Sequence, residues 1–473
     1  MQEEKFDLIV IGSGSGLDVA NAAATQNGLK VAIIEKDKMG GTCLNRGCIP
    51  SKLLIRSADV AETIRHADIF GINVNNLSVD FEKIVNRVNN ITDAHSESIK
   101  GSYQSSVNPI FFSKECKFIG GKKVSFVDGE KTITITADKI LIAAGTRPKI
   151  PEINGLQESG FITSDEALRL KQQPRVLTFI GGGFITCELA HFYGSLGTKI
   201  NIVQLGDKLI PDEDEEISQR FTEVFSKKYN VYLGYNVESV TKEKTKDNES
   251  SGSEIFRITA KNGTSEKMLK VESDQLLVAV GRVPNTYTLD LVKTGVKLDE
   301  KGFIIVDEYL ETNVKGIFAL GDVVGRYQFK HSANHEAQYA YHNILNPDRK
   351  IPVDYTAMPH AIFSSPQVAG VGLTEQQLKG QNKNDYLRSV YPYIQTGMGE
   401  ALEERDGFVK FLVNRENRKI LGCHIMGADA STLIHEVLVA MRAADGTIDG
   451  IRKTIHIHPA LSEVIARAAE TVN

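Results

Sequence analysis

Two stretches of this 473-residue chain repeat one order of elements: an apolar strand, a glycine turn, a helix and a second apolar strand. The glycines are Gly12, Gly14 and Gly16 in the first stretch and Gly181–Gly183 in the second. A unit of this kind is the core of a doubly wound, dinucleotide-binding domain. Glycines that serve only tight turns are the alternative interpretation. Two units with the same pattern favour two dinucleotide sites in an α/β protein.

The second strand of each unit ends about 20 residues after its glycines, at Glu35 in the first unit and Gln204 in the second. The carboxylate of Glu35 can accept hydrogen bonds from an adenosine ribose. Gln204 offers neither a carboxylate for a ribose hydroxyl nor a guanidinium for a 2′-phosphate, and Lys208 is the only nearby cation. The sequence therefore leaves NAD and NADP open and predicts weak discrimination, tilted slightly towards NADH. Leu17 and Thr186 replace the third glycine of the pattern, which affects packing more than binding.

Three further segments carry a glycine turn or a carboxylate at the end of an expected strand. Residues 139–148 and 275–285 each form an apolar strand that turns outward through a glycine, Gly145 or Gly281. Residues 316–322 deliver the carboxylate of Asp322 just beyond a strand. From about residue 351 the pattern changes to strands over 408–413 and 420–426 and helices over 430–444 and 461–470, an α+β arrangement.

Two polar segments have simpler interpretations. The acidic run Asp212–Glu216 could bind a cation, but a helix N-terminus favoured by the helix dipole is the preferred interpretation. The tract Thr241–Glu254, rich in Lys, Glu and Ser, indicates a solvated loop or hairpin tip.

Composition narrows the class of protein. A net charge of −5 removes the electrostatic argument for nucleic acid or an anionic membrane as partner. Five cysteines are too few for a secreted disulfide framework, and the acidic N-terminus resembles no export signal. No long uncharged stretch suits a membrane span. We therefore expect a cytoplasmic protein.

Cys43 and Cys48 lie in the glycine-rich run Gly40–Lys52, directly after the first unit. They could be zinc ligands, but no second Cys or His pair lies nearby to complete a tetrahedral site, so no metal is expected. They could also be inert buried thiols. Their close spacing beside a nucleotide fold favours a redox-active pair, and Lys52 can help to lower a thiol pKa. The other cysteines, Cys116, Cys187 and Cys423, stand in apolar surroundings that suit core packing.

A second candidate cluster lies near the C-terminus. Pro459 suits the first turn of a helix, so His458 is predicted at the helix entrance with Glu463 about one turn inside. A histidine held by a carboxylate is a competent acid–base near neutral pH. The alternative is that His458 and Glu463 form a purely structural contact. The acid–base interpretation is favoured because a reactive dithiol needs a base.

With these motifs the sequence resembles the class I pyridine nucleotide–disulfide oxidoreductases, the group of dihydrolipoamide dehydrogenase, glutathione reductase and mycothione reductase. The resemblance covers essentially the whole chain and implies two doubly wound, Rossmann-like domains plus a C-terminal α+β dimerisation domain. It implies an FAD-binding domain over residues 1–150, an NAD(P)-binding domain over 151–280, a central domain completing the flavin site over 281–350 and a dimerisation domain over 351–473.

The resemblance also assigns roles to residues. Cys48 would lie against the flavin as the charge-transfer thiol, and Cys43 would attack substrate. His458 and Glu463 of the other subunit would form the acid–base pair. Lys52 and Glu188 match a family ion pair beside the flavin. The implied FAD contacts are Gly12, Gly14, Gly16, Glu35, Gly41, Thr42, Lys52, Gly145 and Asp322. The implied NAD(P) contacts are Gly181, Gly183, Phe184, Gln204 and Gly281.

The activity implied is that of an FAD-dependent NAD(P)H:disulfide oxidoreductase, acting on a sulfur group with NAD(P), in a homodimer with shared active sites. Local blocks at residues 58–65, 329–337 and 457–463 are most similar to mycothione reductase, so a small-molecule disulfide is the expected substrate. The alternative is a dihydrolipoyl dehydrogenase that oxidises a dithiol with NAD and has a lipoyl domain as partner. Mercuric reductase and the large thioredoxin reductases fit less well, because the C-terminal end carries no cysteine pair. A flavin-binding interaction protein without turnover is the hypothesis from a different class.

Overall fold

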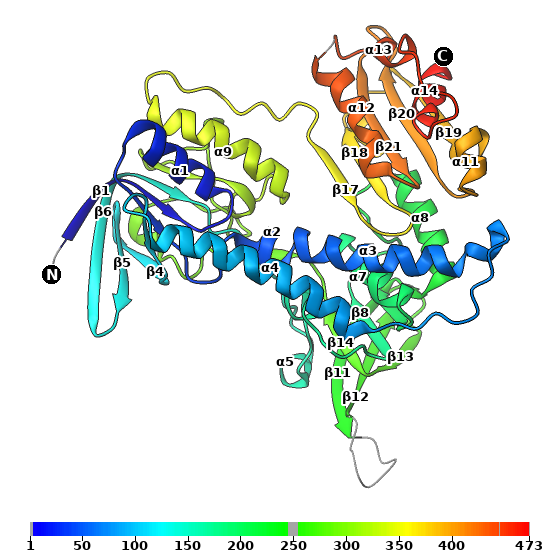
Figure 1. Cartoon of the computed structure of the whole chain (residues 1–473), viewed down its shortest axis with the longest axis horizontal. Coiled ribbons are helices and arrows are strands. Elements are labelled where there is room, and N and C mark those ends of the chain that lie inside the picture. The colour runs from blue at the N-terminus through cyan, green and yellow to red at the C-terminus, as the bar shows by residue number, and fades with distance from the viewer. Residues whose placement is uncertain (1–2, 245–253, 444, 473) are drawn as a thin grey trace. The chain divides into compact units, whose positions relative to one another are not determined.

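In the computed structural model, which describes residues 3–244, 254–443 and 445–472, the first glycine-turn unit forms part of a seven-stranded sheet (Figure 1). The strand order is β3-β2-β1-β6-β5-β4, and β16 pairs with β6. These strands are β1 (Glu3–Ile11), β2 (Val31–Ile34), β3 (Ile110–Phe112), β4 (Cys116–Gly120), β5 (Lys123–Asp128), β6 (Lys131–Ile142) and β16 (Ile317–Ala319). Strand β1 is parallel to β2 and β6, as a doubly wound unit requires.

Alternating residues of β1 serve two hydrophobic cores. Leu8 and Val10 pack in a cluster with residues of α1 (Gly16–Asn27) and α9 (Lys330–Leu345). Ile9 and Ile11 belong to a second cluster with the aromatic side chains of β4 and β5. Because side chains alternate along a strand, this buries the sheet on both faces.

The chain divides into two compact units, which we describe separately. The first contains residues 1–51, 85–149 and 281–354, and the second contains residues 52–84, 150–280 and 355–473. The remaining elements of the first unit are α2 (Gly41–Arg46), β7 (Thr146–Pro148), β15 (Arg282–Pro284), η2 (Leu291–Thr294) and η3 (Gly321–Val323). Helices α3 (Cys48–Arg65) and α4 (Phe81–Gln104) contain residues of both units, and η1 (Ala67–Phe70) lies between them in sequence.

The second unit contains the other glycine-turn unit. Its parallel sheet has the order β10-β9-β8-β14, with β8 (Val176–Ile180), β9 (Lys199–Gln204), β10 (Asn230–Leu233) and β14 (Gln275–Val278). Its helices are α5 (Leu156–Ser159), α6 (Ser164–Ala167), α7 (Phe184–Ser195) and α8 (Glu215–Lys228). Both predicted units are therefore confirmed.

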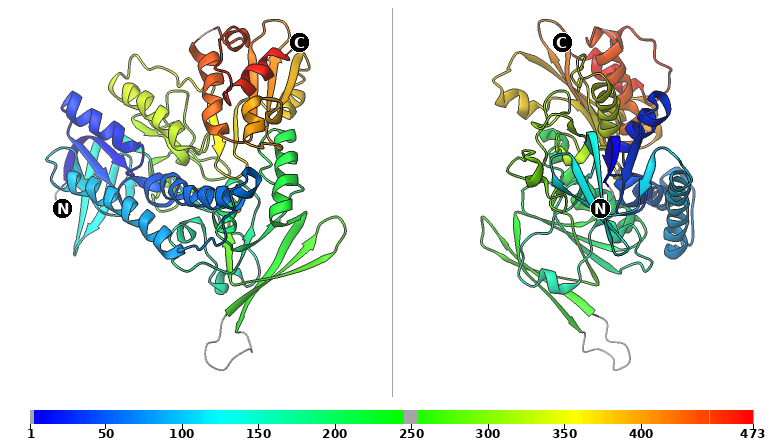
Figure 2. Two further views of the ribbon diagram at one scale, coloured as in Figure 1. Left: turned by 45° about the vertical axis from the view of Figure 1, so that its right-hand side comes forward. Right: turned by 90° about the vertical axis from the view of Figure 1, so that its left-hand side faces the viewer.

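An antiparallel sheet is attached to this parallel sheet. It consists of β11 (Tyr235–Lys244), β12 (Glu254–Asn262) and β13 (Met268–Ser273), visible in green in Figure 2. Strands β11 and β12 pair antiparallel, while most of the tract predicted as a solvated loop or hairpin tip, residues 245–253, lies outside the described residues. The acidic run leads into α8, where Asp214 is the N-cap and accepts the backbone N–H of Glu216 at 3.2 Å, so the helix interpretation is confirmed.

The C-terminal part of the second unit is an antiparallel sheet in the order β17-β18-β21-β20-β19. Its strands are β17 (Pro359–Ile362), β18 (Val368–Gly372), β19 (Tyr386–Pro392), β20 (Phe408–Asn414) and β21 (Ile420–Met426). Its helices are α10 (Glu375–Gly380), η4 (Tyr393–Gln395), α11 (Gly397–Ala401), α12 (Ala430–Ala443), α13 (Asp449–Arg452) and α14 (Glu463–Glu470). The predicted α/β fold with a C-terminal α+β domain is confirmed.

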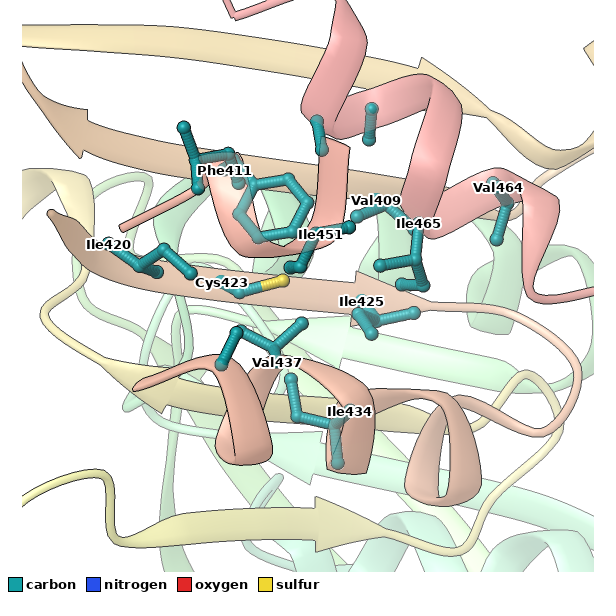
Figure 3. Close-up of a cluster of buried hydrophobic side chains, with 14 of the residues drawn as sticks. Val409, Phe411, Ile420, Cys423, Ile425, Ile434, Val437, Ile451, Val464 and Ile465 are labelled. Carbon is teal, nitrogen blue, oxygen red and sulfur yellow. The ribbon is translucent and has the colours of Figure 1, made fainter. Parts of the chain in front are cut away.

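The core of this domain lies between the sheet and its helices (Figure 3). Side chains of α12, such as Ile434, approach the β20–β21 pair from one side, and those of α14, such as Ile465, from the other. Cys423 lies between them with its thiol enclosed.

One local prediction is wrong. Pro459 does not occupy the first turn of a helix, because α14 begins only at Glu463 with Ser462 as its N-cap. Residues 458–459 and 461–462 form turns instead, so the helical hydrogen bonds start later than the proline suggests. Within the described residues, no helix combines the length and the apolar character needed to cross a bilayer.

Candidate functional site

The first glycine turn has the geometry of a phosphate cradle. Gly12 has φ of +106°, and a Cβ there would lie 2.2 Å from the carbonyl oxygen of Ala143, so no other residue fits without moving the sheet. Gly14 faces open space, since a Cβ added there would have no other atom within 4 Å. Gly16 begins α1, whose N-terminal N–H groups favour an anion. The turn can therefore admit a pyrophosphate to the backbone.

Two carboxylates of the first unit are held in place by hydrogen bonds. Glu35 accepts the backbone N–H of Ser13 through Oε2 and that of Asp37 through Oε1, each at 2.9 Å. Asp322, in η3, accepts the hydroxyl of Thr146 at 3.0 Å. Burial raises the pKa of Asp322, against the opposing effects of Arg282 and Thr146. Both carboxylates are held by backbone or hydroxyl donors, which suits recognition of sugar hydroxyls.

The two cysteines of the predicted redox pair are neighbours. Cys43 lies in α2 and Cys48 is the first residue of α3. The thiols are hydrogen-bonded to each other, and this bond, together with burial and the charge of Cys48, raises the pKa of Cys43, while the charge of Lys330 acts in the opposite direction. Both side chains are half-buried. The two thiols are in the reduced form, and a pair at this distance can close to a disulfide.

Helix α2 begins against the glycine turn. A Cβ on Gly41 would lie 2.8 Å from Cα of Gly14, and the N–H of Gly40 donates to the hydroxyl of Ser13 at 3.1 Å. Thr42 is the second residue of α2. The dithiol segment is therefore anchored directly to the candidate phosphate cradle.

Sequence reasoning missed Lys330, the first residue of α9. Its ammonium donates to the hydroxyl of Ser15 at 2.9 Å, and Ser15 donates to the side-chain oxygen of Asn334 at 2.9 Å. Lys330 also exerts the electrostatic effect on Cys43 described above. The only signal in the sequence was its place in the 329–337 block, because a contact over 315 residues leaves no local pattern.

These residues fit FAD. The open space at Gly14 and the backbone N–H groups at the start of α1 suit a pyrophosphate, and Glu35 suits a ribose. In the described part of the chain, the buried hydroxyl of Ser332 has no hydrogen-bond partner, which indicates a polar group that a ligand can satisfy. Gly145, whose carbonyl accepts the N–H of Asn285 at 3.0 Å, lies in the turn between β6 and β7.

The second glycine turn repeats this geometry. Gly181 has φ of +107°, and a Cβ there would lie 2.3 Å from the carbonyl oxygen of Ala279. Gly183 is the N-cap of α7 and faces open space. Phe184 follows as an exposed aromatic side chain, and Gln204 ends β9. The predicted Gly281 belongs to the first unit, where its carbonyl accepts the N–H of Lys149 at 2.9 Å.

The predicted ion pair between Lys52 and Glu188 is present in the second unit. The ammonium lies 2.8 Å from both carboxylate oxygens, and 4.6 Å from the ring centroid of Phe363. Glu188 is buried in α7. The two residues are 136 positions apart in the sequence. The family resemblance predicted their contact, whereas a local sequence pattern could not predict it.

The predicted acid–base pair is also formed. Nδ1 of His458 lies 3.0 and 3.1 Å from the two carboxylate oxygens of Glu463. The side chain of His458 is 75% exposed while that of Glu463 is 11% exposed. The hydrogen bond to His458 lowers the pKa of Glu463. The imidazole is therefore fixed at one nitrogen and presents the other outward.

The remaining cysteines suit packing, as predicted. Cys116, Cys187 and Cys423 are buried. Burial raises the pKa of all three thiols, that of Cys116 to about 12. Among the described residues, no group of three or more His, Cys, Asp or Glu side chains has the arrangement of a metal site. The dithiol belongs to the first unit and the His458–Glu463 pair to the second.

Comparison with known proteins bears on the whole chain. Residues 6–337 match the family model of the pyridine nucleotide-disulphide oxidoreductases, and residues 358–469 match the dimerisation domain of that family. The chain is 36% identical over 469 residues to a dihydrolipoyl dehydrogenase of Chlamydia muridarum, covering 98% of this chain and 96% of that protein. It is 35% identical over 472 residues to a mycothione reductase of Mycobacterium tuberculosis, covering 98% and 99%.

A solved structure shares the fold. The flavoprotein disulfide reductase RclA from Escherichia coli, solved as a Cu(II) complex, superposes with a TM-score of 0.86 at 24% identity, covering 99% of this chain and all of that one. With two matching family models and relatives above 30% identity over nearly its full length, this chain belongs to the pyridine nucleotide-disulphide oxidoreductases, a family of enzymes that act on sulfur groups with FAD and NAD(P).

Proposed function

We propose that this enzyme reduces a small-molecule disulfide with NAD(P)H, and that Cys43 and Cys48 are its redox-active pair. The observation that carries the proposal is the hydrogen-bonded dithiol, anchored through Gly41 to a glycine turn that is open to a pyrophosphate. Neither a zinc ligand nor an inert core thiol requires that placement.

In this proposal FAD is held by Gly12, Gly14, Gly16, Glu35, Gly41, Thr42, Lys52, Gly145 and Asp322. When bound, FAD supplies transfer of an electron pair between a nicotinamide and a disulfide. The backbone of the glycine turn would hold the pyrophosphate and Glu35 the adenosine ribose. Gly181, Gly183, Phe184, Gln204 and Gly281 would contact NAD(P).

The chain's own chemistry is thiol–disulfide exchange. The thiolate of Cys43 attacks one sulfur of the substrate disulfide, forms a mixed disulfide and releases the other sulfur as a thiolate. His458 gives that thiolate a proton. The thiolate of Cys48 then attacks the sulfur of Cys43 and releases the second product as a thiolate, which takes a proton from water. One substrate disulfide has become two thiols, and the Cys43–Cys48 disulfide has formed.

The dimerisation domain supports a homodimer. We propose that His458 and Glu463 serve the dithiol of the partner copy, as the resemblance implies. Glu463 fixes one imidazole nitrogen, so the outward nitrogen can donate and accept the proton. Lys52 and Glu188 would orient the groups around the flavin. The proposed domains are 1–150 for FAD, 151–280 for NAD(P), 281–350 for completion of the flavin site and 351–473 for dimerisation.

Two candidate substrates remain, and each has one observation in its favour. The 329–337 block, which contains Lys330, favours a mycothione-like disulfide, and the relative from Mycobacterium tuberculosis is a mycothione reductase. The relative from Chlamydia muridarum favours the alternative, a dihydrolipoyl dehydrogenase with a lipoyl domain as partner. The small number of cysteines supports a cytoplasmic location for either.

The deciding experiment measures steady-state rates of the purified flavoprotein with NADH and NADPH against mycothione, glutathione disulfide and lipoamide, and with NAD against dihydrolipoamide. We expect turnover with a small-molecule disulfide. Preferred oxidation of dihydrolipoamide by NAD would support the alternative. Flavin binding without thiol-dependent turnover of any substrate would support an interaction protein and contradict both.

A further inference from the structure

Gln204, the last residue of β9, faces the second glycine turn. A Cβ on Gly182 would lie 2.9 Å from Cδ of Gln204, so the side chain packs directly over the turn. Its Nε2 donates to the carbonyl oxygen of Lys208 at 3.2 Å. The end of β9 therefore offers a neutral amide, tied to the following loop, at the position where an adenosine ribose is recognised.

Lys208 is the cation of this loop, and it is already bound. Its ammonium lies 2.9 Å from Oε1 of Glu215, with 29% of the lysine and 61% of the glutamate side chain exposed. Glu215 is the first residue of α8, and its backbone N–H donates to the side-chain oxygen of Gln376 at 3.1 Å. The carboxylate is thus positioned from a fixed helix end rather than from a loose loop.

The acidic side chains at the start of α8 have two sets of partners. Glu213, Asp214 and Glu216 pair with side chains of the C-terminal domain: His360 at 2.8 Å, Lys410 at 2.8 Å and Arg388 at 2.6 Å, respectively. Glu215 instead pairs with the loop that follows β9. Glu215 therefore neutralises the charge of Lys208, the residue whose carbonyl contacts Gln204.

We infer that Glu215 is a specificity-determining residue which, by holding Lys208, selects NADH over NADPH. The inference rests on the proposed function, in which the second glycine turn binds the nicotinamide coenzyme. A 2′-phosphate carries close to two negative charges and needs a cation. Here it would meet a neutral amide and the carboxylate of Glu215. A ribose 2′-hydroxyl needs only an acceptor, which the amide oxygen of Gln204 can supply.

The test is the variant Glu215→Gln, which leaves the side-chain shape and releases Lys208. We expect the ratio of kcat/KM for NADPH to that for NADH to rise about tenfold, as one new charge-assisted contact to a phosphate allows. In parallel, calorimetry on the flavin-loaded protein should show tighter binding of 2′-phospho-ADP-ribose but not of ADP-ribose. Adding Lys208→Gln to Glu215→Gln should remove both gains.

The matched control is Glu223→Gln, which removes one carboxylate and one exposed ion pair, 3.1 Å from Arg220, on the same helix. An equal rise in this control would show a general effect of net charge and overturn the inference. An unchanged ratio in Glu215→Gln would overturn it as well. If neither coenzyme is oxidised, the proposed function fails, while the two ADP-ribose titrations still decide the role of Glu215.

Discussion

Lys52 donates to both carboxylate oxygens of Glu188 at 2.8 Å, and one of these oxygens also accepts the backbone N–H of Phe363 at 2.9 Å. Three hydrogen bonds from two donor groups thus converge on one buried carboxylate. A carboxylate left without its cation in such a place keeps its desolvation cost, so removal of one partner destabilises more than removal of both.

We therefore expect Lys52→Met to lower the melting temperature of the flavin-loaded enzyme more than Lys52→Met combined with Glu188→Gln. The single change should cost about 2 kcal/mol, because the carboxylate stays buried while the lysine is partly exposed. Differential scanning calorimetry of the four members of this cycle measures the coupling. The exposed pair of Lys5 with Asp138 should show almost none in the same cycle. Equal losses in single and double variants would contradict the prediction.

The dithiol gives a direct test of the redox pair. Cys48→Ser should retain FAD but lose disulfide reduction, because Cys43 then has no partner with which to close a disulfide. Activity and flavin content of the purified variant measure this. The control Cys116→Ala removes a thiol from the core of the same unit and should keep activity. Full activity in Cys48→Ser would exclude the pair.

Lys330 should favour the thiolate of Cys43. In a Cys48→Ser background, adding Lys330→Met should slow alkylation of Cys43 by iodoacetamide at neutral pH severalfold, because the cation that lowers the pKa of Cys43 is gone. Lys330→Arg keeps the charge and should restore the rate. Mass spectrometry of the alkylated peptide gives the readout. Identical rates for methionine and arginine would show that Lys330 has no electrostatic role.

Much of the fold follows from local sequence pattern. Strand β2 (Val31–Ile34) ends where predicted, directly before Glu35, because its fully buried apolar run stops at that charged residue. Strand β21 also has its predicted bounds, because its apolar run is flanked by Lys419 and Gly427. The start of α14 was misplaced, because Pro459 is compatible with a turn as well as with a first helical turn. Lys330 was missed, because its contact with Ser15 depends on the packing of α1 against α9.

Shared active sites give the next prediction. Mixing inactive Cys43→Ser with inactive His458→Ala subunits under exchange conditions should restore about a quarter of wild-type activity. Half of a random mixture is heterodimer, and one of its two sites has both residues intact. Steady-state assays before and after exchange measure the gain. Demonstrated exchange without recovery would mean that the two residues act within one chain or not together.

Acid stability should depend on Glu375. Burial alone would raise the pKa of this carboxyl, but hydrogen bonds from Lys410, Tyr386 and Lys379 outweigh it and hold the pKa at about 2. Its contribution to stability is therefore complete above its ordinary value of 4.5 and is lost as the pH falls to about 2. Glu375→Gln should melt below the wild type at pH 6, and the two melting curves should converge near pH 2, as circular dichroism can follow. A constant gap down to that pH would contradict the assignment.

The carbonyl oxygens of Ala143 and Ala279 stand 2.2 and 2.3 Å from where a side chain would begin at Gly12 and Gly181. At these two positions the sheet itself forbids any other residue, whether or not a nucleotide is bound. A descendant that had lost its coenzyme would keep both glycines merely to stay folded. Gly14 and Gly183 have nothing within 4 Å, so there only a ligand restricts the side chain. In a lineage drifting away from catalysis, those two would be the first to change.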